Sequence, residues 1–142
     1  MSREIEAATA KIMPQVVEWR RHIHQNPELG NREFKTAKYI EAHLRKLGIE
    51  VKTGVAKTGV VGILKGSQMG SVIGLRADMD GLPVSEETGL PYASKATGIG
   101  PDGKPTPTMH ACGHDIHMSA WVGLARRLAA TRSAWSGTVV MI

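Results

Sequence analysis

Apolar side chains recur every three or four residues near the start of the chain, which is the period of an α-helix. The stripe consists of Ile5, Ala8, Ile12, Val16, Trp19 and Ile23. Pro14 interrupts it, so either the stable helix starts near Pro14 or two short helices meet there. The helix should end by Asn26, because Pro27 disfavours helical geometry in the residue before it.

Two further apolar patterns predict helices over residues 32–47 and 116–130. For the first, we expect Asn31 as the N-cap and Gly48 as the C-cap. Its buried face should consist of Phe34, Ala37, Ile40, Leu44 and Leu47. For the second, Asp115 is the expected N-cap. This helix is apolar on nearly all sides, Leu124 included, and should therefore be buried against a sheet.

Short runs of Val, Ile and Leu between and after these helices predict β-strands over 49–52, 59–64, 71–76 and 137–142. The turn-rich link 65–70 indicates a hairpin between the second and third strands. Helices and strands in this order are typical of an α/β fold. In such sheets, ligand sites form where loops leave the ends of the strands.

Residues 82–108 form a long irregular region that holds five of the seven prolines. A loop of this length in a compact domain is usually functional or disordered. The chain then stops on the apolar strand 137–142, with no turn, cap or polar tail behind it. We therefore expect the chain to be the N-terminal piece of a longer protein.

Composition narrows the possible partners. The net charge is +5, but Lys and Arg are interleaved with acids, and only one Phe and two Tyr are available to stack on bases, which argues against a nucleic-acid partner. No apolar run approaches the ~18 residues of a membrane-spanning helix. The N-terminus lacks the apolar core of a secretory signal, and the single cysteine fits a reducing compartment. We expect a cytoplasmic protein without membrane attachment.

The segment 109–117 holds the only cysteine, three of the six histidines and one carboxylate. Cys112 and His114 are separated by one residue, so in an extended backbone both side chains point the same way. His110 shares that parity, and His117 lies one turn into the predicted helix. Each residue alone has an ordinary structural explanation, but a thiol and imidazoles at this density favour metal ligation by Cys112 and His114.

Two carboxylates follow the predicted strand 71–76. Asp78 and Asp80 would suit a metal site, a carboxylate that orients a histidine, or an acid–base pair. A turn is the alternative, because Gly81 and Pro83 follow directly. The residues alone leave the two interpretations open.

Three segments, 19–30, 75–83 and 109–117, occur in the order found in a known family. Together they resemble the M20 metallopeptidases, and most closely the amidohydrolase branch with its hippurate hydrolases, N-acyl-amino-acid amidohydrolases and auxin-conjugate hydrolases. The resemblance extends from about Val16 to the end of the chain. Three motifs in the right order make it specific.

The resemblance implies a zinc-exopeptidase-like, three-layer α/β catalytic domain. Residues 1–142 would be its N-terminal portion, without the lid and dimerisation domain. It also implies two divalent metal ions, Zn, Mn, Co or Ni, with Cys112 and His114 as ligands. Asp80 would have a supporting catalytic role, and Asp78, which stands where the wider family has a histidine, is a possible ligand.

The implied activity is hydrolysis of the amide bond of a small-molecule N-acyl amino acid. In the family the Glu general base and further histidine ligands come after the strand that ends this chain, so we expect an inactive N-terminal fragment of a homo-oligomeric enzyme. Two alternatives remain. One is a non-catalytic metal-binding or interaction module derived from the fold. The other is a thiol hydrolase with Cys112 as nucleophile and His110 or His114 as base.

Overall fold

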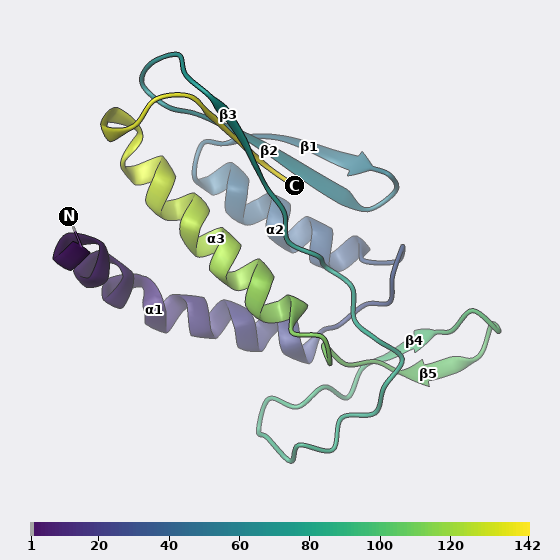
Figure 1. Cartoon of the computed structure of the whole chain (residues 1–142). Coiled ribbons are helices and arrows are strands. Elements are labelled where there is room, and N and C mark those ends of the chain that lie inside the picture. Colours follow the sequence, from purple (N-terminus) through teal and green to yellow (C-terminus); the bar gives the residue numbers. More distant parts are fainter. Residues whose placement is uncertain (1) are drawn as a thin grey trace.

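A mixed four-stranded sheet organises the chain in the computed structural model, which describes residues 2–142 (Figure 1). Its strands are β1 (Glu50–Val55), β2 (Gly59–Lys65), β3 (Val72–Leu75) and β6 (Thr138–Met141), in the order β1-β2-β6-β3. β2 is antiparallel to both β1 and β6, whereas β3 and β6 are parallel. The carboxyl ends of β3 and β6 therefore lie at one edge of the sheet, where α/β folds place ligand sites.

The strands fall where predicted, but the predicted hairpin is wrong. β2 and β3 are not neighbours, because β6 lies between them and bonds to both. The hairpin joins β1 to β2 instead, through a turn in which Ala56 and Lys57 have positive φ angles. Runs of Val and Ile identify strands but not their partners, and β6 lies too far along the sequence for a local turn signal to reveal its position.

Three α-helices pack against one another on one side of this sheet: α1 (Ser2–Gln25), α2 (Phe34–Lys46) and α3 (His114–Ala130). α2 and α3 cover one face of the sheet, and α1 crosses their outer side (Figure 1). Alternate residues of β2 face the helices, so Val60 and Leu64 are buried. The α/β class is confirmed, and residues 2–142 supply the sheet with a helical covering on one face.

The beginning of α2 differs from the prediction. Asn31 is not the N-cap, because its φ angle is +62° and Glu33 occupies the cap position without a side-chain cap bond. The carboxylate of Glu28 performs the capping from outside the helix. It accepts hydrogen bonds from the backbone N–H groups of Lys35 at 3.2 Å and Thr36 at 2.8 Å. The C-cap is Leu47 rather than the predicted Gly48, which follows it with a positive φ angle.

α1 continues through Pro14, so neither the predicted start nor the predicted break occurs there. The proline lacks the N–H that would bond to the carbonyl of Ala10. Ala10 is exposed, so water can satisfy that carbonyl in place of the helix. The helix ends at Gln25, before Pro27, as predicted.

Two residues expected in the core are exposed. Phe34 has 61% of its surface exposed and Leu124 has 42%. Phe34 stands in the first turn of α2 and lines an open groove with Ile99. Periodicity identifies the apolar side of a helix but not how far along the helix its partners extend. The same limit explains Leu124, since the buried residues of α3 include Trp121, Val122 and Ala125 but not every apolar position.

The region 82–108 is mostly irregular, as predicted, but it contains a small hairpin of β4 (Thr97–Ile99) and β5 (Pro105–Pro107). The prolines hid this hairpin, because proline is usually a signal against strands. A short 3₁₀ helix, η1 (Arg132–Ala134), connects α3 to β6. Within residues 2–142, no helix is both long and apolar enough to cross a membrane.

The core predicts a clear contrast between two leucines. Leu44 is fully buried between α2 and the sheet, so Leu44→Ala should lower the free energy of unfolding by about 2–5 kcal/mol through lost contacts and a cavity. Leu124→Ala is the matched control and should change it by only about 0.5 kcal/mol. Urea unfolding measures both. Equal losses for the two variants would contradict the assignment of the core.

Candidate metal centre

The three sequence motifs meet at a junction of backbone hydrogen bonds. The N–H of Gly81 donates to the carbonyl of Glu28 at 2.7 Å. Leu82 and Met109 exchange two hydrogen bonds, of 2.8 and 3.0 Å, as an isolated antiparallel bridge. Gly81 and Leu82, which follow β3, are thus fixed between the loop after α1 and Met109, the first residue of the Cys/His segment.

Glycine is required at the centre of this junction. Gly81 is buried, and a Cβ atom there would lie 2.9 Å from Cβ of Pro27 and 3.1 Å from Cγ2 of Thr108. Contacts this short force the neighbouring segments apart. Residues 76–80 run without a turn, and Gly81 pairs with the segment after α1. The chain bends only further on, at Pro83, where the N–H of Val84 donates to the carbonyl of Leu82 at 2.8 Å.

The junction places Asp80 against His114. The Nδ1 atom of His114 lies 3.0 Å from the backbone carbonyl of Asp80 and 3.0 Å from its Oδ1 atom. Either oxygen can accept the Nδ1–H proton, which fixes the ring orientation and leaves Nε2 as the nitrogen with a free lone pair. A carboxylate or carbonyl on one ring nitrogen is the usual support for a histidine that binds a metal through the other.

Cys112 lies in a turn rather than in an extended segment, so the parity argument for its direction is wrong. Gly113, with φ of +79°, reverses the chain and is the N-cap residue of α3. His114 is therefore the first residue of the helix. The thiol of Cys112 is exposed. The ring of His117 lies 5.8 Å from that of His114, as expected for a residue one turn further along the helix.

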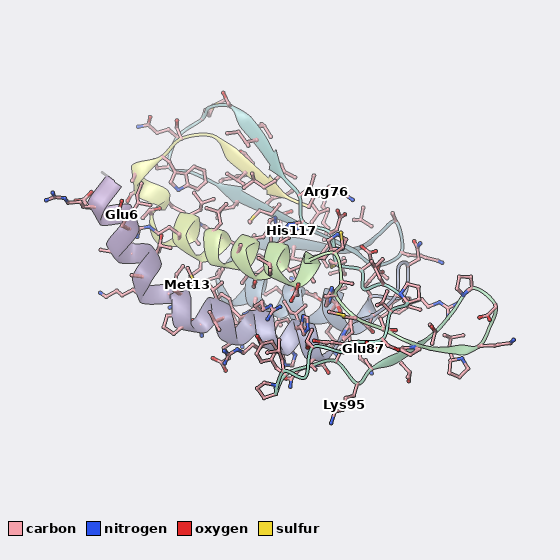
Figure 2. The ribbon with its side chains drawn as sticks, turned by 60° about the horizontal axis from the view of Figure 1, so that its bottom comes forward. Glu6, Met13, Arg76, Glu87, Lys95 and His117 are labelled. Carbon is pink, nitrogen blue, oxygen red and sulfur yellow. The ribbon has the colours of Figure 1, made fainter. Side chains whose placement is uncertain are left out.

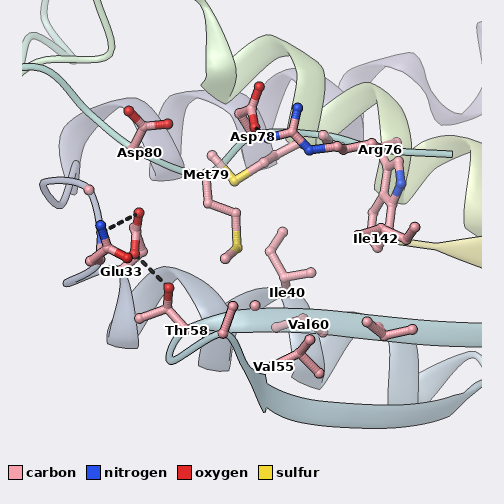
Figure 3. Close-up of a pocket in the computed structure, with 18 residues that line it drawn as sticks. Glu33, Ile40, Val55, Thr58, Val60, Arg76, Asp78, Met79, Asp80 and Ile142 are labelled. Atoms are coloured by element: carbon pink, nitrogen blue, oxygen red, sulfur yellow. Dashed lines mark hydrogen bonds and ion pairs between the residues drawn. The ribbon is translucent and has the colours of Figure 1, made fainter.

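Asp78 and Asp80 border a cavity of about 450 Å³ at the edge where β3 and β6 end (Figure 3). The carboxylate of Asp78 forms an ion pair with Arg76. Across the cavity, Glu33 is held by hydrogen bonds from the backbone N–H of Asn31 at 2.9 Å and the hydroxyl of Thr58 at 2.7 Å. The cavity is large enough for a small organic molecule.

Sequence reasoning missed the environment of His110. This side chain is buried beside the backbone of Asp80, but neither ring nitrogen forms a regular hydrogen bond within the described residues. Burial lowers the pKa of His110 to about 4, although the negative charge of Asp115 acts in the opposite direction. The ring is therefore neutral at physiological pH. The Oδ1 atom of Asp115 is also buried without a partner, and a buried water is the usual way to satisfy such groups.

A cluster of four ionisable side chains behind the Cys/His motif was also not predicted: Arg20, His24, Glu86 and Asp115. Asp115 was expected to cap α3, but it is fully buried and bonds to the side chains of α1 instead. We call these four residues the buried ion cluster. No signal in the sequence relates Glu86 to His24, because they are joined only by the fold.

The donor set fits a divalent metal ion only in part. The exposed thiol of Cys112 and the free Nε2 of His114 are ligands that zinc and neighbouring transition metals accept. Across residues 2–142, no group of three or more His, Cys, Asp or Glu side chains is placed to hold a metal ion. These residues therefore present two fitting donors and a support, and not a complete coordination shell.

Glu86 should make stability depend on pH. Burial by itself raises its pKa, but hydrogen bonds from Thr88, His24 and the Ser94 backbone lower the pKa from 4.5 to about 2. Its ionised form therefore adds stability above about pH 4.5, and this contribution is lost as the pH falls toward 2.

Glu86→Gln should accordingly destabilise the protein most at pH 7, and the difference from wild type in urea unfolding should shrink at pH 3. Glu87→Gln is the control, because Glu87 is an exposed neighbour (Figure 2) and should change little. A loss in Glu86→Gln that is independent of pH would contradict the assigned contacts.

Comparison with known proteins finds a family to which this chain is similar. The profile of Peptidase family M20/M25/M40 matches residues 74–142. An N-acetyl-L-cysteine deacetylase of Bacillus subtilis is 42% identical over 128 residues, which are 90% of this chain and 29% of that protein. A hippurate hydrolase of Campylobacter jejuni is 47% identical over 110 residues, 78% of this chain and 26% of that protein.

The fold agrees with the sequence comparison. The crystal structure of the YXEP protein of Bacillus subtilis, described as a dinuclear metal binding peptidase from the M20 family, superimposes with a TM-score of 0.81 at 38% identity. The superposition covers 93% of this chain and 34% of that one. The chain thus spans about a third of the length of the relatives it matches. By sequence and by fold, it is similar to members of Peptidase family M20.

Proposed function

We propose that this chain contributes Cys112 and His114 as metal ligands to an amidohydrolase that cleaves the amide bond of N-acyl amino acids. The observation that carries the proposal is the contact of 3.0 Å between Asp80 and Nδ1 of His114. This contact supports a metal bound through Nε2, with Asp80 as the residue that orients the ring. The exposed thiol of Cys112, two residues before His114, is the second donor.

The substrate class rests on relatives. Similar proteins include a hippurate hydrolase and an N-acyl-L-amino acid amidohydrolase, whose names denote hydrolysis of N-acylated amino acids. The cavity beside Asp80 supports a small-molecule substrate, since its walls combine apolar side chains such as Met79 and Ile142 with charged ones such as Arg76. An amphiphilic molecule with a carboxylate and an apolar group suits such a lining.

Two divalent ions, Zn, Mn, Co or Ni, are the proposed cofactors, in line with the dinuclear metal binding of the similar Bacillus subtilis structure. Bound ions would polarise the amide carbonyl and lower the pKa of the attacking water. The protein's own part is to present the Cys112 thiol and to hold the His114 ring against Asp80. Asp78, whose Oδ1 atom pairs with Arg76, is a possible further ligand through its other carboxylate oxygen.

The remaining ligands and the general base belong, in this proposal, to parts of the longer relatives that the chain does not span. The 142 residues alone should then be inactive, because residues 2–142 place no third ligand beside the first two. We propose a cytoplasmic homo-oligomer for the complete enzyme.

Metal content and hydrolysis test the proposal together. The 142-residue chain and a version extended to the length of its relatives are assayed with N-benzoylglycine, and bound metal is measured by elemental analysis. Only the extended protein should hydrolyse the substrate, and a chelator should abolish the activity. Cys112→Ser should lower the metal content, whereas His22→Ala, at an exposed position on α1, should not.

Two results would contradict this function. Chelator-resistant hydrolysis that Cys112→Ser abolishes would identify a thiol hydrolase. Metal binding without hydrolysis of any N-acyl amino acid by the extended protein would identify a non-catalytic module.

A further inference from the structure

The buried ion cluster connects three parts of the chain that are distant in sequence. His24, near the end of α1, has only 3% of its surface exposed. Its Nδ1 atom lies 2.8 Å from Oδ2 of Asp115, in the first turn of α3. Its Nε2 atom lies 3.0 and 3.1 Å from the two carboxylate oxygens of Glu86, in the loop after β3. Both carboxylates are inaccessible to solvent, with 0% and 1% of their side chains exposed.

Hydrogen bonds and an ion pair link the members of this cluster. Ionised carboxylates only accept hydrogen bonds, and each nitrogen of the His24 ring faces one of the two carboxylates. Arg20 adds a positive charge, with its Nε atom 2.7 Å from Oδ2 of Asp115 and its Nη2 atom 3.4 Å from Nδ1 of His24. The ring of Tyr92 covers the guanidinium of Arg20, with its centroid 5.2 Å away, and packs edge-on to His24. Removing one member leaves a buried charge uncompensated, which is costly.

One side of the cluster acts on the candidate metal centre. Asp115 directly follows His114 in the first turn of α3, so the position of its carboxylate restrains the backbone that carries His114. On its other side, His114 is held through Nδ1 by Asp80. The direction of the free Nε2 therefore depends on two anchors, and the buried anchor depends on His24.

The other side of the cluster organises the loop. Besides His24, Glu86 accepts hydrogen bonds from the hydroxyl of Thr88 at 2.6 Å and the backbone N–H of Ser94 at 2.5 Å. The hydroxyl of Ser94 donates to the carbonyl of Thr108 at 2.7 Å. This bond connects the loop to the residue just before Met109. One carboxylate thus fixes the path of the loop from 86 to 94, and His24 joins that carboxylate to α3.

We propose that His24 is a positioning residue for the metal centre: by holding Glu86 and Asp115 together it fixes the first turn of α3 and the loop over it, and so sets the direction of His114. This inference rests on the proposed function, since it assigns a role relative to a bound metal. It differs from a purely stabilising role, which would affect unfolding but not the ligand geometry.

Cobalt(II) binding separates these roles. The purified protein, extended as above, is titrated with Co²⁺, whose visible bands report ligand geometry and whose near-ultraviolet band reports the Cys112 thiolate. His24→Gln replaces the two ring nitrogens by a single amide nitrogen, which cannot face both carboxylates as the ring does. It should weaken Co²⁺ binding by about 10–100-fold and shift the visible bands. His43→Gln, at a histidine on α2 outside the cluster, is the matched control and should leave both unchanged.

Trypsin cleavage measures whether the loop from 86 to 94 stays attached. Lys95 is exposed and points away from the body of the molecule (Figure 2), so trypsin can cleave after it once the loop detaches. Cleavage at Lys95 should be faster in His24→Gln than in wild type or His43→Gln. If His24→Gln fails to fold, Glu86→Gln replaces it, because it removes one charge and keeps an acceptor for the Ser94 N–H.

The outcomes are distinct. Wild-type Co²⁺ affinity and wild-type bands in a folded variant would overturn the inference, even if the variant is less stable, because His24 would then be structural only. Failure of the wild-type protein to bind Co²⁺ would overturn the proposed function, and this inference with it.

Discussion

The hydrogen bond from the Gly81 N–H to the carbonyl of Glu28, at 2.7 Å, is the constraint on which the candidate site depends. It and the neighbouring bridge between Leu82 and Met109 join three segments that the sequence keeps far apart. Without them, the segment after β3 would lose its backbone connection to the loop after α1 and to Met109. The close approach requires that residue 81 has no side chain, because the space of a Cβ is occupied by Pro27 and Thr108.

Two consequences follow on opposite sides of α3. On the open side, the junction fixes Asp80 at hydrogen-bonding distance from His114, next to the cavity at the edge of the sheet. On the buried side, the loop that leaves the junction returns to α1 through Glu86 and His24. The first turn of α3 is held from both sides, which is how a short Cys/His motif acquires a defined direction before any metal binds. Pre-organisation of this kind reduces the free energy that a ligand must provide on binding.

The sequence predicts the elements of the fold better than their arrangement. Helix and strand positions follow from apolar periodicity, and the end of α1 follows from Pro27. The partner of β2 does not follow, because β6 reaches it only through the folded chain. Local capping rules also failed twice. Glu28, several residues upstream, caps α2 in place of Asn31, and Asp115 bonds to His24 rather than to its own helix end. In the first case a carboxylate just outside the helix replaced the expected cap, and in the second a contact between distant segments prevailed over a local preference.

For the candidate site, residue types indicated Cys112, His114 and Asp80, and the structure brings the last two into contact. The ion cluster could not be predicted, because nothing local distinguishes Glu86 from its exposed neighbour Glu87.

Hydrogen exchange of the Gly81, Leu82 and Met109 amides tests the central claim most directly. If the junction holds the site together, these amides should exchange as slowly as that of Leu64 in the core strand β2. Exchange at the rate of exposed loop amides would show that the junction opens independently of the core, and would contradict the account.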